Sequence, residues 1–239
     1  MMDDEVWTII VAGGSGRRYG AHKQFEPLGG SRVIDITVEI AASVSQVVVV
    51  LPSDRLDELI PGATRIVEGG VTRSHSVRAG LAVIPDSAEV ILVHDGARPL
   101  ATARLFASMI QAVRDGAEVA VPVVEIADSL RHRDGEPLDR ADVVAVQTPQ
   151  SFEAEWLRGA HADGGEATDD ATLAERAGAE VLLLAGEADN TKITFPRDLA
   201  LAEAILRQRS AAATADARDV QDGAASAESA TLDAVKGPS

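Results

Sequence analysis

The stretch that decides the fold is VWTIIVAGGSGRRYGAHKQF, residues 6–25. It opens with seven mostly apolar or β-branched residues, which predict a buried strand, and the glycines behind them predict a tight turn. Arg17, Arg18 and Lys23 follow directly, so that N–H groups of the turn and full positive charges would face the same anion. The sequence therefore predicts a phosphate-binding loop for a nucleoside triphosphate, with a plain strand-to-helix connection as the alternative.

Two common glycine motifs do not describe this loop. A P-loop requires Gly-Lys followed by Ser or Thr, a string that the chain does not contain. A dinucleotide fingerprint requires G-x-G-x-x-G, whereas the glycines here are Gly14, Gly16 and Gly20, with one residue too many before the last. The spacing therefore disfavours a dehydrogenase.

The composition is that of an acidic α/β protein without cysteine. A chain of 239 residues is long enough for one domain with a full core, built from aliphatic side chains because aromatic residues make up only 3%. The formal net charge of −16 argues against nucleic acid or an anionic membrane as a partner. Without cysteine there is no disulfide, thiol nucleophile or Cys-ligated metal. The acidic first residues do not resemble a signal peptide, and no apolar run approaches the roughly 18 residues that span a bilayer. We therefore expect a cytoplasmic protein.

Strand-like apolar runs alternate with helical patterns along most of the chain. This alternation predicts an α/β fold with a Rossmann-like, mostly parallel sheet flanked by helices. A second glycine turn, Gly69-Gly70, follows a strand as the first one does, so both should face one crevice at the carboxyl ends of the strands. After the first strand we expect strands at 46–51, 65–67, 90–93, 119–124, 143–147, 181–185 and 192–195, and helices at 31–44, 72–84, 102–115, 152–161, 169–177 and 196–209.

Two segments fall outside this alternation. Residues 125–142 are too polar to bury themselves, and we expect them to form a projecting β-arm that reaches a partner subunit. Residues 210–239 are rich in Ala, Asp, Ser and Thr and have few large apolar side chains, which predicts a disordered acidic tail. The predicted organisation is one domain over residues 1–209, followed by the tail.

Several strings, in order along the chain, carry a resemblance to a known family. They are AGGSGRRYG with Lys-Gln-Phe (12–25), Gly-Gly-x-x-Arg-x-x-Ser-Val (69–77), His-Asp-Gly-Ala-Arg-Pro (94–99), Gln-Thr-Pro-Gln (147–150), Thr-Asp-Asp-Ala (168–171) and Asn-x-Lys-Ile-Thr (190–194). Together they resemble the 2-C-methyl-D-erythritol 4-phosphate cytidylyltransferases, a family of sugar nucleotidyltransferases, over residues 6–207. The resemblance implies that residues 1–209 are a nucleotidyltransferase domain and that the arm joins two copies in a homodimer.

The resemblance also implies a reaction. It is the transfer of CMP from CTP to 2-C-methyl-D-erythritol 4-phosphate, which yields 4-diphosphocytidyl-2-C-methyl-D-erythritol and pyrophosphate in the non-mevalonate route to isoprenoid precursors. Both reactants are anions, so the protein must supply cations around the α-phosphate and a Mg²⁺ site rather than a covalent intermediate. Asp95, directly after a buried strand, is the candidate metal ligand. By resemblance the catalytic residues are Arg18, Lys23 and Lys192; the nucleotide is bound by Ala12, Gly13, Gly14, Ser15, Gly16, Lys23, Gly70, Arg73, Ser76, Asp95 and Gly96; and the polyol phosphate is bound by Arg98, Ser129, Arg140 and Lys192.

Other functions and other roles for these residues stay open at the level of sequence. A CTP:ribitol-5-phosphate cytidylyltransferase shares the glycine loop and the Thr-Pro-Gln string, and a non-catalytic nucleotide-binding protein would keep the loop without transferring anything. Taken singly, Lys23 could be a solvated cation, Asp95 a turn cap and Ser76 a helix residue without a ligand. Lys192 could be an ordinary lysine at the end of a strand. Ser129 stands where the family more often has threonine.

Overall fold

One mixed sheet forms the centre of the protein, in the computed structural model that describes residues 5–14, 19–20 and 22–212. Its strands follow the order β10-β7-β11-β6-β1-β4-β5, and β12 also pairs with β7. All pairings are parallel except those of β10 and β11, which run antiparallel to their neighbours. The strands are β1 (Val6–Val11), β4 (Gln46–Leu51), β5 (Arg65–Glu68), β6 (Val90–Asp95), β7 (Val119–Val124), β10 (Ala145–Val146), β11 (Gln150–Glu153) and β12 (Val181–Ala185).

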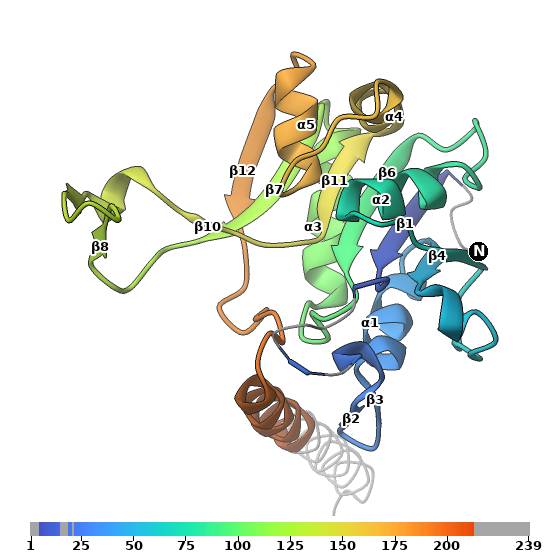
Figure 1. Cartoon of the computed structure of the whole chain (residues 1–239), viewed down its shortest axis with the longest axis horizontal. Helices are drawn as coiled ribbons and strands as arrows, with labels where there is room; N and C mark the ends of the chain where they lie inside the picture. Colours follow the sequence, from blue (N-terminus) through green and yellow to red (C-terminus); the bar gives the residue numbers. More distant parts are fainter. Residues whose placement is uncertain (1–4, 15–18, 21, 213–239) are drawn as a thin grey trace, which may run out of the picture.

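Helices cover both faces of this sheet (Figure 1). Neighbouring strand residues point to opposite faces, and both faces are buried, which is why the strands read as unbroken apolar runs. Thus Ile9 packs in the cluster beneath one helical layer and Ile10 in the cluster beneath the other. The first layer contains α2 (Arg73–Leu81), α4 (Ala154–Ala162) and α5 (Asp170–Arg176), and the second contains α1 (Val33–Ala42) and α3 (Ala103–Arg114). The structure confirms the predicted Rossmann-like α/β class.

The largest departure from the predicted elements is β11. Residues 152–161 were expected to be one helix, but Phe152 lies in a strand and the helix starts only at Ala154. The strand pairs with β6 on one side and β7 on the other, and Phe152 is fully buried. Pairing on both sides satisfies the backbone, so tertiary context decides the conformation of this short segment.

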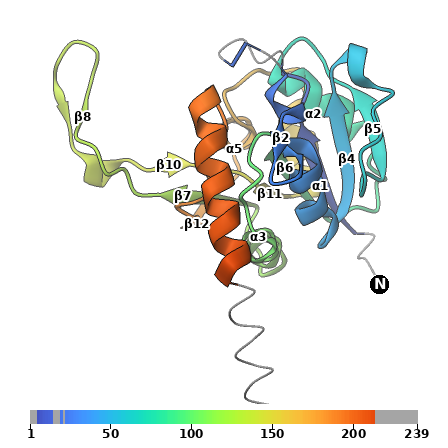
Figure 2. The same ribbon diagram turned by 90° about the horizontal axis from the view of Figure 1, so that it is seen from below.

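The predicted strand at 192–195 does not form. Residues 191–194 have no regular structure. The segment crosses the end of β6, where Ile193 N donates to Ala97 O at 2.9 Å and the Ile193 side chain is buried. The helix after it runs from 196 to 212, past the predicted end at 209, and so includes the first residues of the predicted tail. Figures 1 and 2 show this last helix beside the small hairpin of β2 (Pro27–Leu28) and β3 (Ser31–Arg32), where Ala202 is buried in one cluster with Leu28. Residues 213–239 lie outside the described residues.

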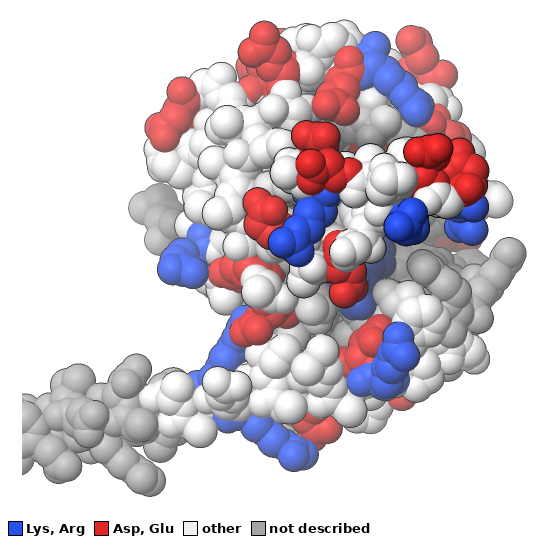
Figure 3. Space-filling view, turned by 90° about the vertical axis from the view of Figure 1, so that its left-hand side faces the viewer, with Lys and Arg blue, Asp and Glu red and all other residues white. Residues whose placement is uncertain are grey.

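Residues 125–142 leave the sheet at the end of β7 and project well away from the rest of the protein (Figures 1 and 2). They form the hairpin of β8 (Leu130–Arg131) and β9 (Pro137–Leu138) and return through the 3-10 turn Arg140–Asp142 to β10. Viewed from the side of the arm, acidic and basic side chains are interspersed with uncharged surface (Figure 3). Within the described residues, no helix combines the length and the apolar character needed to cross a bilayer.

Candidate active site

A pocket of about 640 Å³ opens at the carboxyl ends of β1 and β6. Both predicted glycine turns reach it, as expected for ligand sites in open α/β sheets. Its lining includes the predicted residues Ala12, Gly13, Gly14, Lys23, Gly70, Arg73, Ser76, Asp95, Gly96 and Lys192, together with Val11, Tyr19, Gln24, Val71, Thr72, Ala97 and Thr194. The predicted residues Ser15, Gly16 and Arg18 lie outside the described residues.

The first glycine turn is held by the segment that carries Lys23. Gln24 is buried, and its Nε2 donates to Ala12 O at 2.6 Å. The Lys23 ammonium donates to the carbonyl of Ile193, which connects this turn to the segment that carries Lys192. Two lysines from distant parts of the sequence are therefore brought to the same wall of the pocket.

The second glycine turn packs against the first at close range. A Cβ on Gly13 would lie 3.5 Å from Ser76 Oγ and 3.6 Å from Gly69 Cα, and a Cβ on Gly70 would lie only 2.3 Å from the Cβ of His75. Ser76 Oγ donates to Thr72 O at 3.0 Å and accepts from Gly70 N at 3.2 Å. The hydroxyl of Ser76 thus fixes the shape of the turn as well as lining the pocket.

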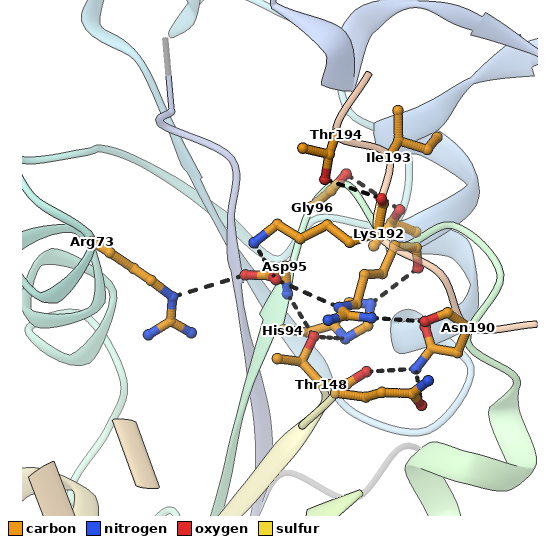
Figure 4. A network of polar contacts seen from close by, with 12 residues as sticks. Arg73, His94, Asp95, Gly96, Thr148, Asn190, Lys192, Ile193 and Thr194 are labelled. Atoms are coloured by element: carbon orange, nitrogen blue, oxygen red, sulfur yellow. Dashed lines mark hydrogen bonds and ion pairs between the residues drawn. The ribbon is translucent and has the colours of Figure 1, made fainter. Parts of the chain in front are cut away.

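Asp95 ends β6 at the floor of the pocket, where three cationic side chains surround it (Figure 4). Lys192 Nζ lies 2.7 Å from Asp95 Oδ2, Arg98 Nε 3.5 Å from the same oxygen, and Arg73 Nε 3.8 Å from Oδ1. Burial alone would raise the pKa of the Asp95 carboxyl, but Lys192, Arg73 and Arg98 outweigh that effect and hold the pKa well below its usual range. The site therefore carries one ionised carboxylate and an excess of positive charge.

A buried histidine is connected to the backbone of Asp95 through hydrogen bonds. His94 Nε2 lies 3.2 Å from Arg98 O and must donate to it, so Nδ1 accepts from the Thr148 hydroxyl at 3.0 Å. The Thr148 hydroxyl in turn accepts from Asp95 N at 3.1 Å. Burial lowers the pKa of His94 to about 4, so this chain of hydrogen bonds contains a neutral imidazole at pH 7.

The segment before Lys192 is hydrogen-bonded to Thr148 and Arg98. Asn190 Nδ2 donates to Thr148 O at 2.9 Å and to Gln147 Oε1 at 3.1 Å. Arg98 Nη1 donates to Asn190 O at 2.7 Å. These bonds hold the segment against the end of β6 and so place the Lys192 side chain over Asp95 (Figure 4).

Three predicted acceptor-binding residues are not brought to the pocket. The Arg98 side chain is only 11% exposed and lies beneath Asp95, outside the pocket lining. Ser129 and Arg140 are exposed on the arm, and Arg140 Nη1 donates to Ala127 O within the arm. Within one copy of the chain, the arm residues are therefore separate from the pocket.

Sequence reasoning did not assign roles to several residues that build the site. Gln24, Thr148 and Asn190 each belong to a string that carried the resemblance, but nothing in their spacing revealed the hydrogen bonds they make. Thr148 is separated from Asp95 by 53 residues, so only the insertion of β11 beside β6 brings them together.

The charge arrangement limits how a metal could be held. In the described parts of the chain, no three His, Cys, Asp or Glu side chains gather as a metal site would require. Asp95 offers a single carboxylate, which fits Mg²⁺ because this ion commonly takes one or two carboxylates and its remaining ligands from substrate phosphates and water. The surrounding cations would repel a lone Mg²⁺, so the residues present fit the ion only together with a polyphosphate.

The fold and the pocket define a class of protein, a Rossmann-like α/β protein with cations around one carboxylate at the carboxyl edge of its sheet. The model of the IspD family, 2-C-methyl-D-erythritol 4-phosphate cytidylyltransferase, matches residues 6–208. The cytidylyltransferase of that name from Rhodococcus opacus is 41% identical over 218 residues, which cover 85% of this chain and 96% of the relative. The chain belongs to the 2-C-methyl-D-erythritol 4-phosphate cytidylyltransferase family.

Solved structures agree with this assignment. The crystal structure of 2-C-methyl-D-erythritol 4-phosphate cytidylyltransferase from Thermus thermophilus aligns with a TM-score of 0.75 at 37% identity, over 85% of this chain and 99% of the other. The structure of the bifunctional IspDF from Campylobacter jejuni aligns with a TM-score of 0.74 at 29% identity, but this chain covers only 53% of it.

Proposed function

We propose that the protein transfers CMP from CTP to 2-C-methyl-D-erythritol 4-phosphate, releasing pyrophosphate and forming 4-diphosphocytidyl-2-C-methyl-D-erythritol. The observation that carries the proposal is the pocket, where Arg73 and Lys192 lie beside Asp95 and Lys23 lines the same pocket next to two glycine turns. Membership of the cytidylyltransferase family supplies the identity of the two substrates. A cytoplasmic location is part of the same proposal.

The reaction needs charge stabilisation more than acid–base chemistry. A phosphate oxygen of the acceptor forms a bond to the α-phosphorus of CTP, and the bond from that phosphorus to the bridging oxygen breaks, so that pyrophosphate leaves with the electron pair. Lys23 and Lys192 would neutralise the charge that develops on the phosphates. We assign the same role to Arg18, from the sequence alone. Ala12, Gly13, Gly14, Ser15, Gly16, Gly70, Ser76 and Gly96 would bind the nucleotide, together with Lys23, Arg73 and Asp95.

Mg²⁺ dependence is also part of the proposal. Asp95 would hold the ion, which when bound would draw negative charge from the phosphate oxygens of CTP. In the structure Lys192 Nζ forms an ion pair with Asp95 Oδ2 at 2.7 Å. Lys192 would therefore have to exchange Asp95 for a phosphate when the nucleotide enters, and this exchange keeps the buried carboxylate paired in both states.

We further propose that the arm forms a homodimer and that Ser129 and Arg140 contact the acceptor bound to the partner subunit. Their exposure on a segment remote from their own pocket supports this assignment. The described contacts of Arg98 favour an indirect effect on the acceptor, through Asp95 and Asn190. Sedimentation of the full chain and of a variant with residues 129–138 replaced by a short linker tests the dimer: a monomeric full chain would contradict it.

The transfer assay incubates the purified protein with CTP, Mg²⁺ and either 2-C-methyl-D-erythritol 4-phosphate or ribitol 5-phosphate, and identifies the cytidine diphosphate product by mass. We expect the methylerythritol product, with Lys23→Ala as the inactive control. A preference for ribitol phosphate would support the alternative cytidylyltransferase. Nucleotide binding without pyrophosphate release with either acceptor would support a non-catalytic protein.

A further inference from the structure

Asp170, the first residue of α5, is a buried carboxylate that the proposed reaction does not use. Its side chain is only 1% exposed. Asp170 Oδ2 accepts a hydrogen bond of 2.5 Å from Arg73 Nη1, and Oδ1 lies 3.0 Å from His161 Nε2. A buried carboxylate requires such partners. Asp170 therefore connects α4 and α5 to Arg73, the first residue of α2, which lines the pocket.

The position of Asp170 is fixed independently of Arg73. A carboxylate has no proton to donate, so His161 Nε2 donates to it, and the 3% exposure of His161 shows that this bond is buried. The backbone of α5 is held at the next residue, where Ala171 N donates to Gln150 Oε1 at 3.2 Å. Asp170 thus presents Arg73 with a fixed acceptor.

The Arg73 guanidinium faces the pocket, and a fixed acceptor restricts its orientation. Its side chain is 23% exposed and reaches the pocket, with Nε 3.8 Å from Asp95 Oδ1 (Figure 4). Its contacts with the described residues are made by Nε and Nη1, so a ligand would be met by Nη2 or by the second N–H of Nη1. An arginine loses many rotamers on ordering, and a fixed partner for Nη1 selects which edge of the guanidinium faces the ligand.

We propose that Asp170, backed by His161, is a positioning residue that orients Arg73 toward the nucleotide in the pocket. This proposal rests on the proposed function only in taking CTP as the ligand of the pocket. Asp170 does not touch the ligand; its effect passes through Arg73. Removing the Asp170 charge should weaken CTP binding when Arg73 is present and have little effect when Arg73 is absent.

The test is a double-mutant cycle with the variants Asp170→Asn, Arg73→Ala and the two combined. CTP affinity is measured by titration calorimetry with Mg²⁺ present, and kcat/KM for CTP by pyrophosphate release. We expect Asp170→Asn to lower both quantities at least tenfold in the native background and less than twofold in the Arg73→Ala background. The matched control is Asp169→Asn, which removes the same charge one residue earlier, where the carboxylate caps α5 through Thr172 N.

Equal losses in the two backgrounds would show that Asp170 serves the fold alone and would overturn the proposal, as would an Asp170→Asn protein within twofold of wild type. If Asp170→Asn does not fold, the cycle is run with His161→Ala. His161→Gln should restore CTP binding because its amide can still donate to Asp170. A wild-type protein that binds CTP without turnover would contradict the proposed function, while the binding cycle would still decide the role of Asp170.

Discussion

Lowering the pH should destabilise the protein through His94. The imidazole is fully buried and already donates through Nε2 to Arg98 O and accepts through Nδ1 from Thr148. Burial lowers its pKa from 6.5 to about 4. His94 therefore takes up a proton near pH 6.5 in the unfolded chain but only near pH 4 in the folded protein. Folding stability is fully present above pH 6.5 and falls as the pH drops through this window.

The size of the effect follows from the width of the window. Each pH unit within it costs about 1.4 kcal/mol of unfolding free energy. His94 should thus remove about 2 kcal/mol by pH 5 and about 3 kcal/mol by pH 4, where its contribution levels off. A loss of this size is a substantial part of the roughly 5–15 kcal/mol that stabilises a typical domain.

Urea denaturation followed by circular dichroism at pH 4.5–7.5 measures this dependence. The variant His94→Gln keeps a donor and an acceptor but cannot titrate, so the difference in unfolding free energy between wild type and variant isolates His94. We expect the unfolding free energy of wild type to fall relative to that of the variant as the pH drops from 6.5 to 5. The control His132→Gln removes an exposed histidine of the arm. A difference in unfolding free energy between wild type and His94→Gln that stays constant across this range would refute the argument for a buried neutral imidazole.

Three further changes have defined outcomes. Lys23→Ala should abolish CMP transfer, a loss of at least about 100-fold from a missing charge at the phosphates, while the circular dichroism spectrum shows an intact fold; full activity would exclude Lys23 from catalysis. Mg²⁺ alone should bind weakly because Lys192 and Arg73 already face Asp95, and calorimetry should show tighter binding once CTP is present; tight binding without nucleotide would contradict this. Gly80→Ala should destabilise the fold by about 1–3 kcal/mol because the new Cβ would lie 2.7 Å from Ile9 Cγ2, and an unchanged urea midpoint would show that this approach relaxes.

The parallel strands of the sheet could be predicted because their patterns are long and unambiguous. A run such as Val47–Val50 is buried on both faces and has no other stable environment. Strand β11 could not be recognised in the same way. Its four residues carry polar Gln150 and Ser151, which are nevertheless completely buried between β6 and β7. Only the neighbouring strands, distant in sequence, determine that conformation.

The same division applies to the pocket. The glycine turns and Asp95 could be predicted because each lies at the end of a strand, and the carboxyl ends of parallel strands meet at one edge. Lys192 could be predicted only through the family resemblance, because the contacts that bring it to Asp95 depend on Thr148 and Asn190 in segments far apart in the chain. The pairing of Asp170 with Arg73 spans 97 residues and has no local signal in the sequence.

The most direct measurement is a crystal structure of the protein with CTP and Mg²⁺. The triphosphate should lie across the first glycine turn, with Lys23 and Lys192 in contact with its oxygens and Asp95 released from Lys192 to the metal. A nucleotide bound elsewhere, with the Lys192–Asp95 ion pair intact beneath an empty pocket, would contradict the proposal that two phosphate esters meet at this edge of the sheet.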